Sequence, residues 1–499
     1  MYIKSCIIFI FIFPIILFAQ SDSTKVVEII HADKLIFNTL EDGSSVRKIV
    51  GNVQLKQEET LMFCDSAFMY KEDNKIDAVG NIRIEDGDSI KAFSDTLKYD
   101  GNAKIAHLIG NAELTDGDMR LTSQTLLYDT ENDVGSYDNY GKLTNDSTVL
   151  TSIKAKYFAD SKDAFFKDSV VIIDPEFELI SDTMRYNTGN KVAQFYGPTT
   201  IYNDSSTINC TNGIYDTDNG LAYFGAGTVI NNPPQVLYAD SLYYERNNGY
   251  GKALKYFDWY DAEMKAGMTG TSAEYFENNQ KIIAYNRPIL NVQVEEDTMY
   301  MSGDIVRSED NIVSNEKQFE AFHSVRIFKS DMQGVCDSLY FSFADSLFRM
   351  YDNPIVWNEQ NEMKGDTMFI QLKNEEIDHL VCRENSFIVS QAAGKLFDQV
   401  KGKYITGYFA NSELQKVFVN KNAHSLYFGK NDADEFVGGN DAKSSTMWVY
   451  MEEQEISRIS FIETPEAIFT PMSQMGQSQL YLDGFSWSPT VRPVSKDDL

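Results

Sequence analysis

Apolar and polar residues alternate along most of this chain, in short runs that recur at a near-constant interval. One such run is "FSDTLKYD" at residues 93–100, in which the polar Lys98 separates Leu97 from Tyr99. Because successive side chains point to opposite faces of a strand, Leu97 and Tyr99 would share one face. The pattern therefore predicts a β-strand with one apolar face turned toward an interior.

Counterparts of Tyr99 follow at a fixed spacing. Five consecutive intervals of 29 residues lead from Tyr99 to Tyr244. If the copies stack as a repeat, their apolar pairs line up into one continuous column. Eight residues are our candidates for this column: Leu97, Tyr99, Leu126, Tyr128, Met184, Tyr186, Leu242 and Tyr244.

A second run alternates with the first, as in "VGNVQL" (50–55) and "VGNIRI" (79–84). Glycine permits a tight turn or a bulge, and we expect a strand to begin there. Each unit of about 29 residues would then hold two short strands, and stacking would bury the apolar face that one unit leaves open. Many copies of the first run open with aspartate, such as Asp65 and Asp95, which we expect at strand starts, bonded to nearby backbone. Calcium ligands, catalytic acids and sites of O-glycosylation are the alternatives for these residues.

These runs resemble the OstA/LptA family of lipopolysaccharide-transport proteins. The "D-S/T-A/L/M" openings and the "VGNIRIEDGD" type of second strand carry the resemblance over residues 25–310. It resumes at 322–342, where His323 and Ser324 replace Gly-Asn. The family implies an all-β fold: an elongated, half-open β-jellyroll, a solenoid-like stack of short antiparallel strands.

The same resemblance implies a function. The chain would be a periplasmic component that binds lipopolysaccharide and bridges toward outer-membrane assembly, without enzymatic activity. The acyl chains would lie in the apolar groove formed by the candidate column. Other β-jellyroll components of the pathway would be its partners, joined by end-to-end strand pairing.

The N-terminus reads as an export signal. Lys4 precedes an apolar run from Ile7 to Phe18, and the small Ala19 follows. The run is short of the ~20 residues that a membrane-spanning helix needs, so cleavage near Ala19 is favoured over a membrane anchor. We therefore expect a periplasmic protein, with association with the outer membrane as a further option.

The period also suggests domain limits. The polar segment 302–318 interrupts the repeat, and 429–445 is rich in Gly and Asp. We predict a signal peptide at 1–19, a first OstA-like repeat region at 20–310 and a second at 311–430. Residues 431–499 would form C-terminal strands and an extended, exposed tail.

Charge and cysteine spacing exclude several classes of protein. The formal net charge of −30 argues against nucleic-acid binding, which needs clustered Lys and Arg. Four cysteines beyond the leader (Cys64, Cys210, Cys336 and Cys382) show no CxxC spacing, so we expect buried thiols rather than zinc ligands and leave disulfides open. No catalytic or metal-binding motif stands out, so no catalytic residue, cofactor or metal is predicted.

Two other functions remain open at this point. A structural or adhesive envelope solenoid would have the same repeat and a filled core. A carbohydrate-active β-solenoid enzyme would need a cleft with converging carboxylates. An open apolar trough would separate the transport protein from both.

Overall fold

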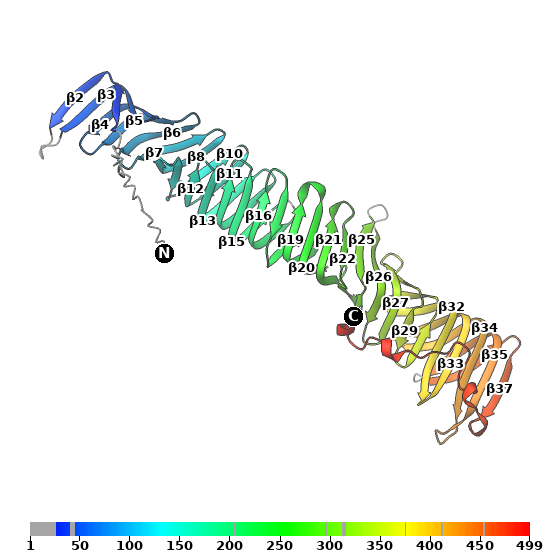
Figure 1. Cartoon of the computed structure of the whole chain (residues 1–499). Coiled ribbons are helices and arrows are strands. Elements are labelled where there is room, and N and C mark those ends of the chain that lie inside the picture. The colour runs from blue at the N-terminus through cyan, green and yellow to red at the C-terminus, as the bar shows by residue number, and fades with distance from the viewer. Residues whose placement is uncertain are drawn as a thin grey trace, which may run out of the picture. The chain divides into compact units, whose positions relative to one another are not determined.

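The computed structural model describes residues 26–39, 45–203, 205–294, 297–311, 316–374, 376–410, 413–452 and 455–499 (Figure 1). The predicted signal peptide lies outside these ranges. Within them the regular structure is antiparallel β-strand, apart from short 3₁₀ turns, so the all-β prediction is confirmed. No helix in the described ranges is long and apolar enough to cross a membrane.

The chain divides into two compact units, one ending at Asp168 and the other beginning at Ser169. The strands of the first unit are β1 (Glu28–His31), β2 (Lys34–Thr39), β3 (Ser45–Gln57), β4 (Thr60–Tyr70), β5 (Lys75–Asp86), β6 (Ile90–Asp100), β7 (Ile105–Asp116), β8 (Met119–Asp129), β9 (Val134–Tyr137), β10 (Gly141–Asn145), β11 (Thr148–Ser152) and β12 (Lys154–Phe158). Strand β13 (Asp163–Asp174) contains the division.

The second unit begins within β13 and ends in a segment without strands. Its further strands are β14 (Phe177–Asn187), β15 (Val192–Tyr202), β16 (Thr207–Asp216), β17 (Leu221–Phe224), β18 (Thr228–Asn232), β19 (Gln235–Glu245), β20 (Tyr250–Asp261), β21 (Ala266–Phe276), β22 (Lys281–Tyr285), β23 (Ile289–Val294), β24 (Asp297–Ser302), β25 (Ile305–Asn311), β26 (Glu316–Phe328), β27 (Met332–Ser342), β28 (Leu347–Tyr351), β29 (Ile355–Asn358), β30 (Asn361–Lys364), β31 (Thr367–Lys373), β32 (Glu376–Ala393), β33 (Leu396–Ala410), β34 (Glu413–Lys430), β35 (Phe436–Glu452), β36 (Glu455–Ile462) and β37 (Glu466–Pro471). The predicted boundary at residue 310 falls within β25, which pairs with β26. The domain limits remain predictions.

The long strands are bent in the middle rather than interrupted. In β5, Gly80 (φ 85°) and Asn81 (φ 47°) are both left-handed, and the register with β6 shifts between Val79 and Ile82. A Cβ atom on Gly80 would lie 2.3 Å from Oδ2 of Asp65, which explains the glycine. The expectation that a strand begins at this glycine is therefore wrong, because β5 begins at Lys75 and runs through the bulge.

The repeated aspartates belong to these bulges. Asp65 lies within β4, and its Oδ2 accepts a hydrogen bond of 2.9 Å from Nδ2 of Asn81. Asp95 in β6 accepts the equivalent bond of 2.9 Å from Asn111. For Asp65 and Asp95 the expectation of a strand start is wrong, because each lies within a strand and holds the left-handed Asn of the neighbouring strand. Asp297 does begin its strand, β24. In the described residues no cluster of acids, His and Cys is suited to hold a metal ion.

The second unit makes the same bulge without glycine. His323 (φ 61°) and Ser324 (φ 53°) are left-handed, and the register between β26 and β27 shifts at this point. His323 Nδ1 lies 3.6 Å from Oδ1 of Asp337, which precedes Ser338 as Asp65 precedes Ser66. His323 and Ser324 therefore adopt the same left-handed backbone conformation as the Gly-Asn pairs.

The segment after β37 is extended, and part of it packs against the second unit. More than half of the residues in its last part, 486–499, are exposed. Figure 1 shows it running back across the strands of the second unit. Leu482 is 6% exposed within a cluster on β32–β34, and Phe485 and Trp487 pack against the same cluster. Further along, Arg492 Nε donates a hydrogen bond of 2.8 Å to Oε1 of Gln333. Apolar residues of this segment therefore pack on an apolar face of β32–β34, a contact that the sequence pattern does not predict.

Candidate functional site

The four column candidates of the first unit lie on one continuous buried face. Leu97 and Tyr99 in β6 and Leu126 and Tyr128 in β8 are each 1–2% exposed. Strand β7 lies between them, and its Leu108 pairs with Leu97 on one side and Leu126 on the other. The apolar pairs of β6 and β8 are therefore joined into one column across three strands.

The second unit arranges its four candidates in the same way. Met184 and Tyr186 in β14 are fully buried, Leu242 in β19 is 5% exposed, and Tyr244 is half-buried. Residues paired across neighbouring strands connect Met184 and Tyr186 with Leu242 and Tyr244 through β15, β16 and β17. Along the tyrosine row the residues alternate between large and small: Tyr186, Ala193, Tyr215, Ala222 and Tyr244. This alternation lets rings from every second strand interdigitate in the interior.

The strands turn at two opposite edges. We call A-row the turns between β3 and β4, β5 and β6, and β7 and β8, and their equivalents along the chain. The B-row comprises the turns between β4 and β5, β6 and β7, and β12 and β13, with their equivalents. Tyr99 and Tyr128 stand next to B-row turns.

Hydrogen bonds join the two rows in the first unit, and we call them row bridges. Tyr128 Oη donates to Oδ2 of the A-row Asp86 over 2.9 Å, and Tyr157 Oη donates to Oδ2 of Asp116 over 2.7 Å. Gln57 Nε2 donates to the carbonyl oxygen of Gly101 over 2.7 Å. The bridges therefore tie the open edges of the strands together beside the apolar column. Sequence reasoning missed them because the bridged residues lie 41 to 44 residues apart.

Burial and charge set the proton equilibria of the bridges. Burial raises the pKa of Asp86, and burial together with the carboxylates of Asp86 and Asp133 raises the pKa of Tyr128. Burial also acts on Asp116, but hydrogen bonds from Lys162 and Tyr157 outweigh it and lower the pKa of that carboxyl. Lys162 Nζ lies 2.6 Å from Asp116 Oδ2, so this bridge is an ion pair as well.

The interior of the second unit contains a cavity of about 210 Å³. Two column candidates, Leu242 and Tyr244, line it. Further lining comes from apolar and aromatic side chains: Ile208, Phe224, Ile230, Leu237, Ala253, Phe257, Trp259, Ala273, Tyr275 and Ile282. Polar groups at its margin include Glu277, whose Oε2 accepts a hydrogen bond of 3.2 Å from Tyr244 Oη. The cavity can take up an apolar group without any specific polar chemistry.

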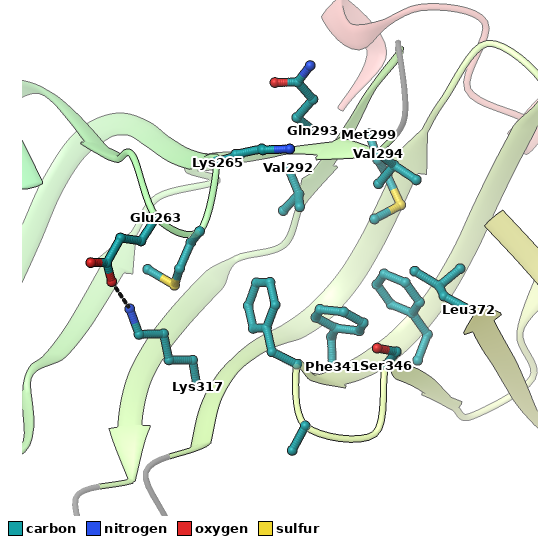
Figure 2. Close-up of a pocket in the computed structure, with 14 residues that line it drawn as sticks. Glu263, Lys265, Val292, Gln293, Val294, Met299, Lys317, Phe341, Ser346 and Leu372 are labelled. Atoms are coloured by element: carbon teal, nitrogen blue, oxygen red, sulfur yellow. Dashed lines mark ion pairs between the residues drawn. The ribbon is translucent and has the colours of Figure 1, made fainter. Parts of the chain in front are cut away.

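A second, larger cavity of about 560 Å³ lies between the two rows of the same unit. Figure 2 shows Val292, Val294 and Met299 from the A-row side facing Phe341 and Leu372 from the B-row side. Lys317 stands at one end of this gap (Figure 2), with Nζ 3.8 Å from Oε2 of Glu263 and 3.9 Å from Oδ2 of Asp261. The sequence pattern gives no sign of a cavity here.

The four described cysteines are buried and unpaired. Burial raises the pKa of the Cys64 thiol to about 12 and that of Cys210 to about 11. A thiol in that state is protonated at neutral pH and is a poor nucleophile or metal ligand. The expectation of buried small apolar side chains is confirmed.

A family comparison addresses the part of the chain that carries the first column. The model of the family described as OstA-like protein matches residues 24–182. These residues form an OstA-like domain. The OstA-like domain includes Leu97, Tyr99, Leu126 and Tyr128, together with the row bridges of Asp86 and Asp116, and it ends two residues before Met184.

The chain is also similar to solved structures. One of them is the crystal structure of LptH, the LptA homologous periplasmic component of the conserved lipopolysaccharide transport device from Pseudomonas aeruginosa. The two chains are 17% identical over 21% of this chain and 81% of that chain, with a TM-score of 0.20. At that score the likeness adds no argument about this chain beyond the OstA-like domain. No curated protein matches the chain.

Proposed function

We propose that this protein is a periplasmic component of lipopolysaccharide transport to the outer membrane, and that it binds acyl chains without catalysing a reaction. The observation that carries the proposal is the continuous apolar column inside each unit, which in the second unit opens into a cavity beside Leu242 and Tyr244. The OstA-like domain and the export signal expected at the N-terminus support the same pathway and compartment.

The physical chemistry of the column suits a lipid with several acyl chains. Each methylene removed from water contributes about 0.8 kcal/mol, so a long apolar surface binds such chains with no polar recognition. Neighbouring strands repeat similar side chains, so successive positions offer similar free energies. A lipid is then not held at one favoured point, which transport along the protein requires.

Partners of the same fold would join at the ends of the strand ladder. Strands β36 and β37 both pair with β35 as the last strands of the chain. On β37, Ile468 is 70% exposed and Phe469 is 55% exposed. An exposed apolar strand at the end of a sheet is a surface for strand addition, so this end is our proposed contact for another β-jellyroll component.

A filled-core envelope solenoid is the second candidate function, and one observation favours it. The column residues of the first unit are packed to 1–2% exposure beside the row bridges, as in an ordinary core. In that case the first unit would be a scaffold and would hold no lipid.

Mass spectrometry of lipid that co-purifies with the protein from its native envelope tests the proposal. The wild type should carry lipopolysaccharide, and Leu242→Gln and Met184→Gln should lose most of it. Tyr243→Gln is the matched control, because Tyr243 neighbours Leu242 on the opposite face of β19. Circular dichroism verifies folding of each variant. A lipid-free wild type that also fails to bind added lipopolysaccharide would leave the filled-core scaffold as the better account.

A further inference from the structure

The cavity between the two rows of the second unit differs from the bridged edge of the first unit in its chemistry. In the first unit the facing groups are hydroxyl, amide, carboxylate and ammonium groups, joined at 2.6–2.9 Å. Around this cavity the facing groups are mainly apolar: Met264, Val292, Val294, Met299, Phe341, Phe343, Phe348 and Leu372. An apolar gap of about 560 Å³ at this edge has the volume of a small-molecule site.

The cavity leads from solvent into the interior column. Met299, Phe341 and Phe348 are 2–5% exposed and belong to the buried face of their strands. Phe343 is half-buried and Ala344 is exposed, and both lie at the B-row turn after β27. The lining therefore passes from exposed turn residues to fully buried interior residues.

Charged side chains stand on both sides of this apolar entrance. Lys265 is exposed at the A-row turn after β20, and Lys317 stands opposite on the B-row side. Lys317 lies 3.8 Å from Glu263 and 3.9 Å from the buried Asp261, so carboxylates offset its charge, whereas Lys265 stands exposed at the entrance. The exposed Lys265 beside an apolar entrance suits an amphiphile with an anionic head and an alkyl tail.

We infer that this cavity is a lateral port, through which an alkyl chain of an anionic amphiphile passes between solvent and the interior, with its head beside Lys265. The inference rests on the proposed function, because the port serves the apolar interior. It assigns the exchange of lipid to the gap between the A-row turn at 262–265 and the B-row turn at 343–346, instead of to the bridged edge of the first unit.

The test follows the rate at which a fluorescent fatty acid, 11-(dansylamino)undecanoic acid, enters the full-length protein in a stopped-flow mixer. Ala344→Trp should slow entry at least fivefold without changing the final occupancy, because it obstructs the entrance and leaves the interior intact. Ala433→Trp, at an exposed turn elsewhere in the same unit, should leave the rate unchanged. Phe343→Glu is a second entrance variant and should also slow entry.

Charge at the rim gives an independent readout. Lys265→Glu should slow entry of the acid about threefold or more and leave its uncharged methyl ester unaffected. Entry rates equal to wild type in both Ala344→Trp and Phe343→Glu would overturn the port and leave acyl-chain binding standing. A wild type that binds neither probe would overturn the proposed function itself, and the port with it.

Discussion

Replacing Tyr128 by phenylalanine removes one hydroxyl from a row bridge and keeps the buried ring. The hydroxyl lies 2.9 Å from Asp86 Oδ2 and 2.9 Å from Asp133 Oδ1, and its single proton serves one carboxylate at a time. The ring is 1% exposed, so the variant creates no cavity and loses almost no apolar burial. The expected cost is that of one hydrogen bond to a charged group, about 1.5–3 kcal/mol.

Tyr99→Phe provides the comparison with a neutral partner. Its hydroxyl donates to the amide oxygen of Gln57 over 2.6 Å, and a neutral hydrogen bond contributes about 0.5–1.5 kcal/mol. The two variants thus remove the same group from equivalent strand positions and differ in the charge of the partner. Tyr140→Phe is the control, because Tyr140 is 61% exposed in the same unit.

Hydrogen–deuterium exchange of the full chain measures these local stabilities without requiring two-state unfolding. Peptides that cover the turns at 86–90 and 129–134 should exchange roughly 10- to 150-fold faster in Tyr128→Phe, since 1.4 kcal/mol corresponds to a tenfold change. The change in Tyr99→Phe should be smaller, and Tyr140→Phe should match the wild type. An equal or larger change in Tyr99→Phe, or no change in Tyr128→Phe, would refute the assignment of the bridge to a charged hydrogen bond.

Three further predictions follow from the fold. Gly80→Ala should destabilise the first unit by several kcal/mol, because the added Cβ would meet the Asp65 carboxylate. Gly87→Ala should cost about 1 kcal/mol, for its left-handed backbone alone. Urea unfolding followed by far-UV circular dichroism compares the two variants. Cys64 and Cys210 should resist iodoacetamide at pH 8 for as long as the protein is folded and react once it is denatured, as peptide mass spectrometry would show, because burial raises their thiol pKa values. Removal of residues 472–499 should increase binding of an apolar dye by uncovering the cluster around Phe397, and unchanged dye binding would contradict the packing of the tail.

The alternation of apolar and polar residues was sufficient to predict the strands and their buried faces. Leu97 and Tyr99 lie on one buried face because strand side chains alternate, and neighbouring strands carry the same pattern. Local sequence therefore contains this information in full. It also contains the bulge signal, although Gly80-Asn81 was interpreted as the start of a strand when it is a bend within one.

Contacts between distant residues could not be predicted in this way. Tyr128 and Asp86 are 42 residues apart, and only the bent course of the strands brings their two rows together. The pattern also gave no indication that the tail around Leu482 would cover β32–β34. Whether the interior is open or filled depends on such contacts, so the cavity beside Leu242 and the tight packing beside Leu126 look alike in the sequence.

The central claim is that acyl chains of lipopolysaccharide lie in the interior column. Site-specific photo-cross-linking in living cells tests it most directly, with benzoyl-phenylalanine placed in turn at Leu126 and Leu242 on the buried face and at Leu127 and Tyr243 on the opposite face. The account predicts lipopolysaccharide adducts at Leu242 and Leu126 and none at their two neighbours. Adducts of equal yield on both faces, or none at the buried positions of a folded protein, would contradict it.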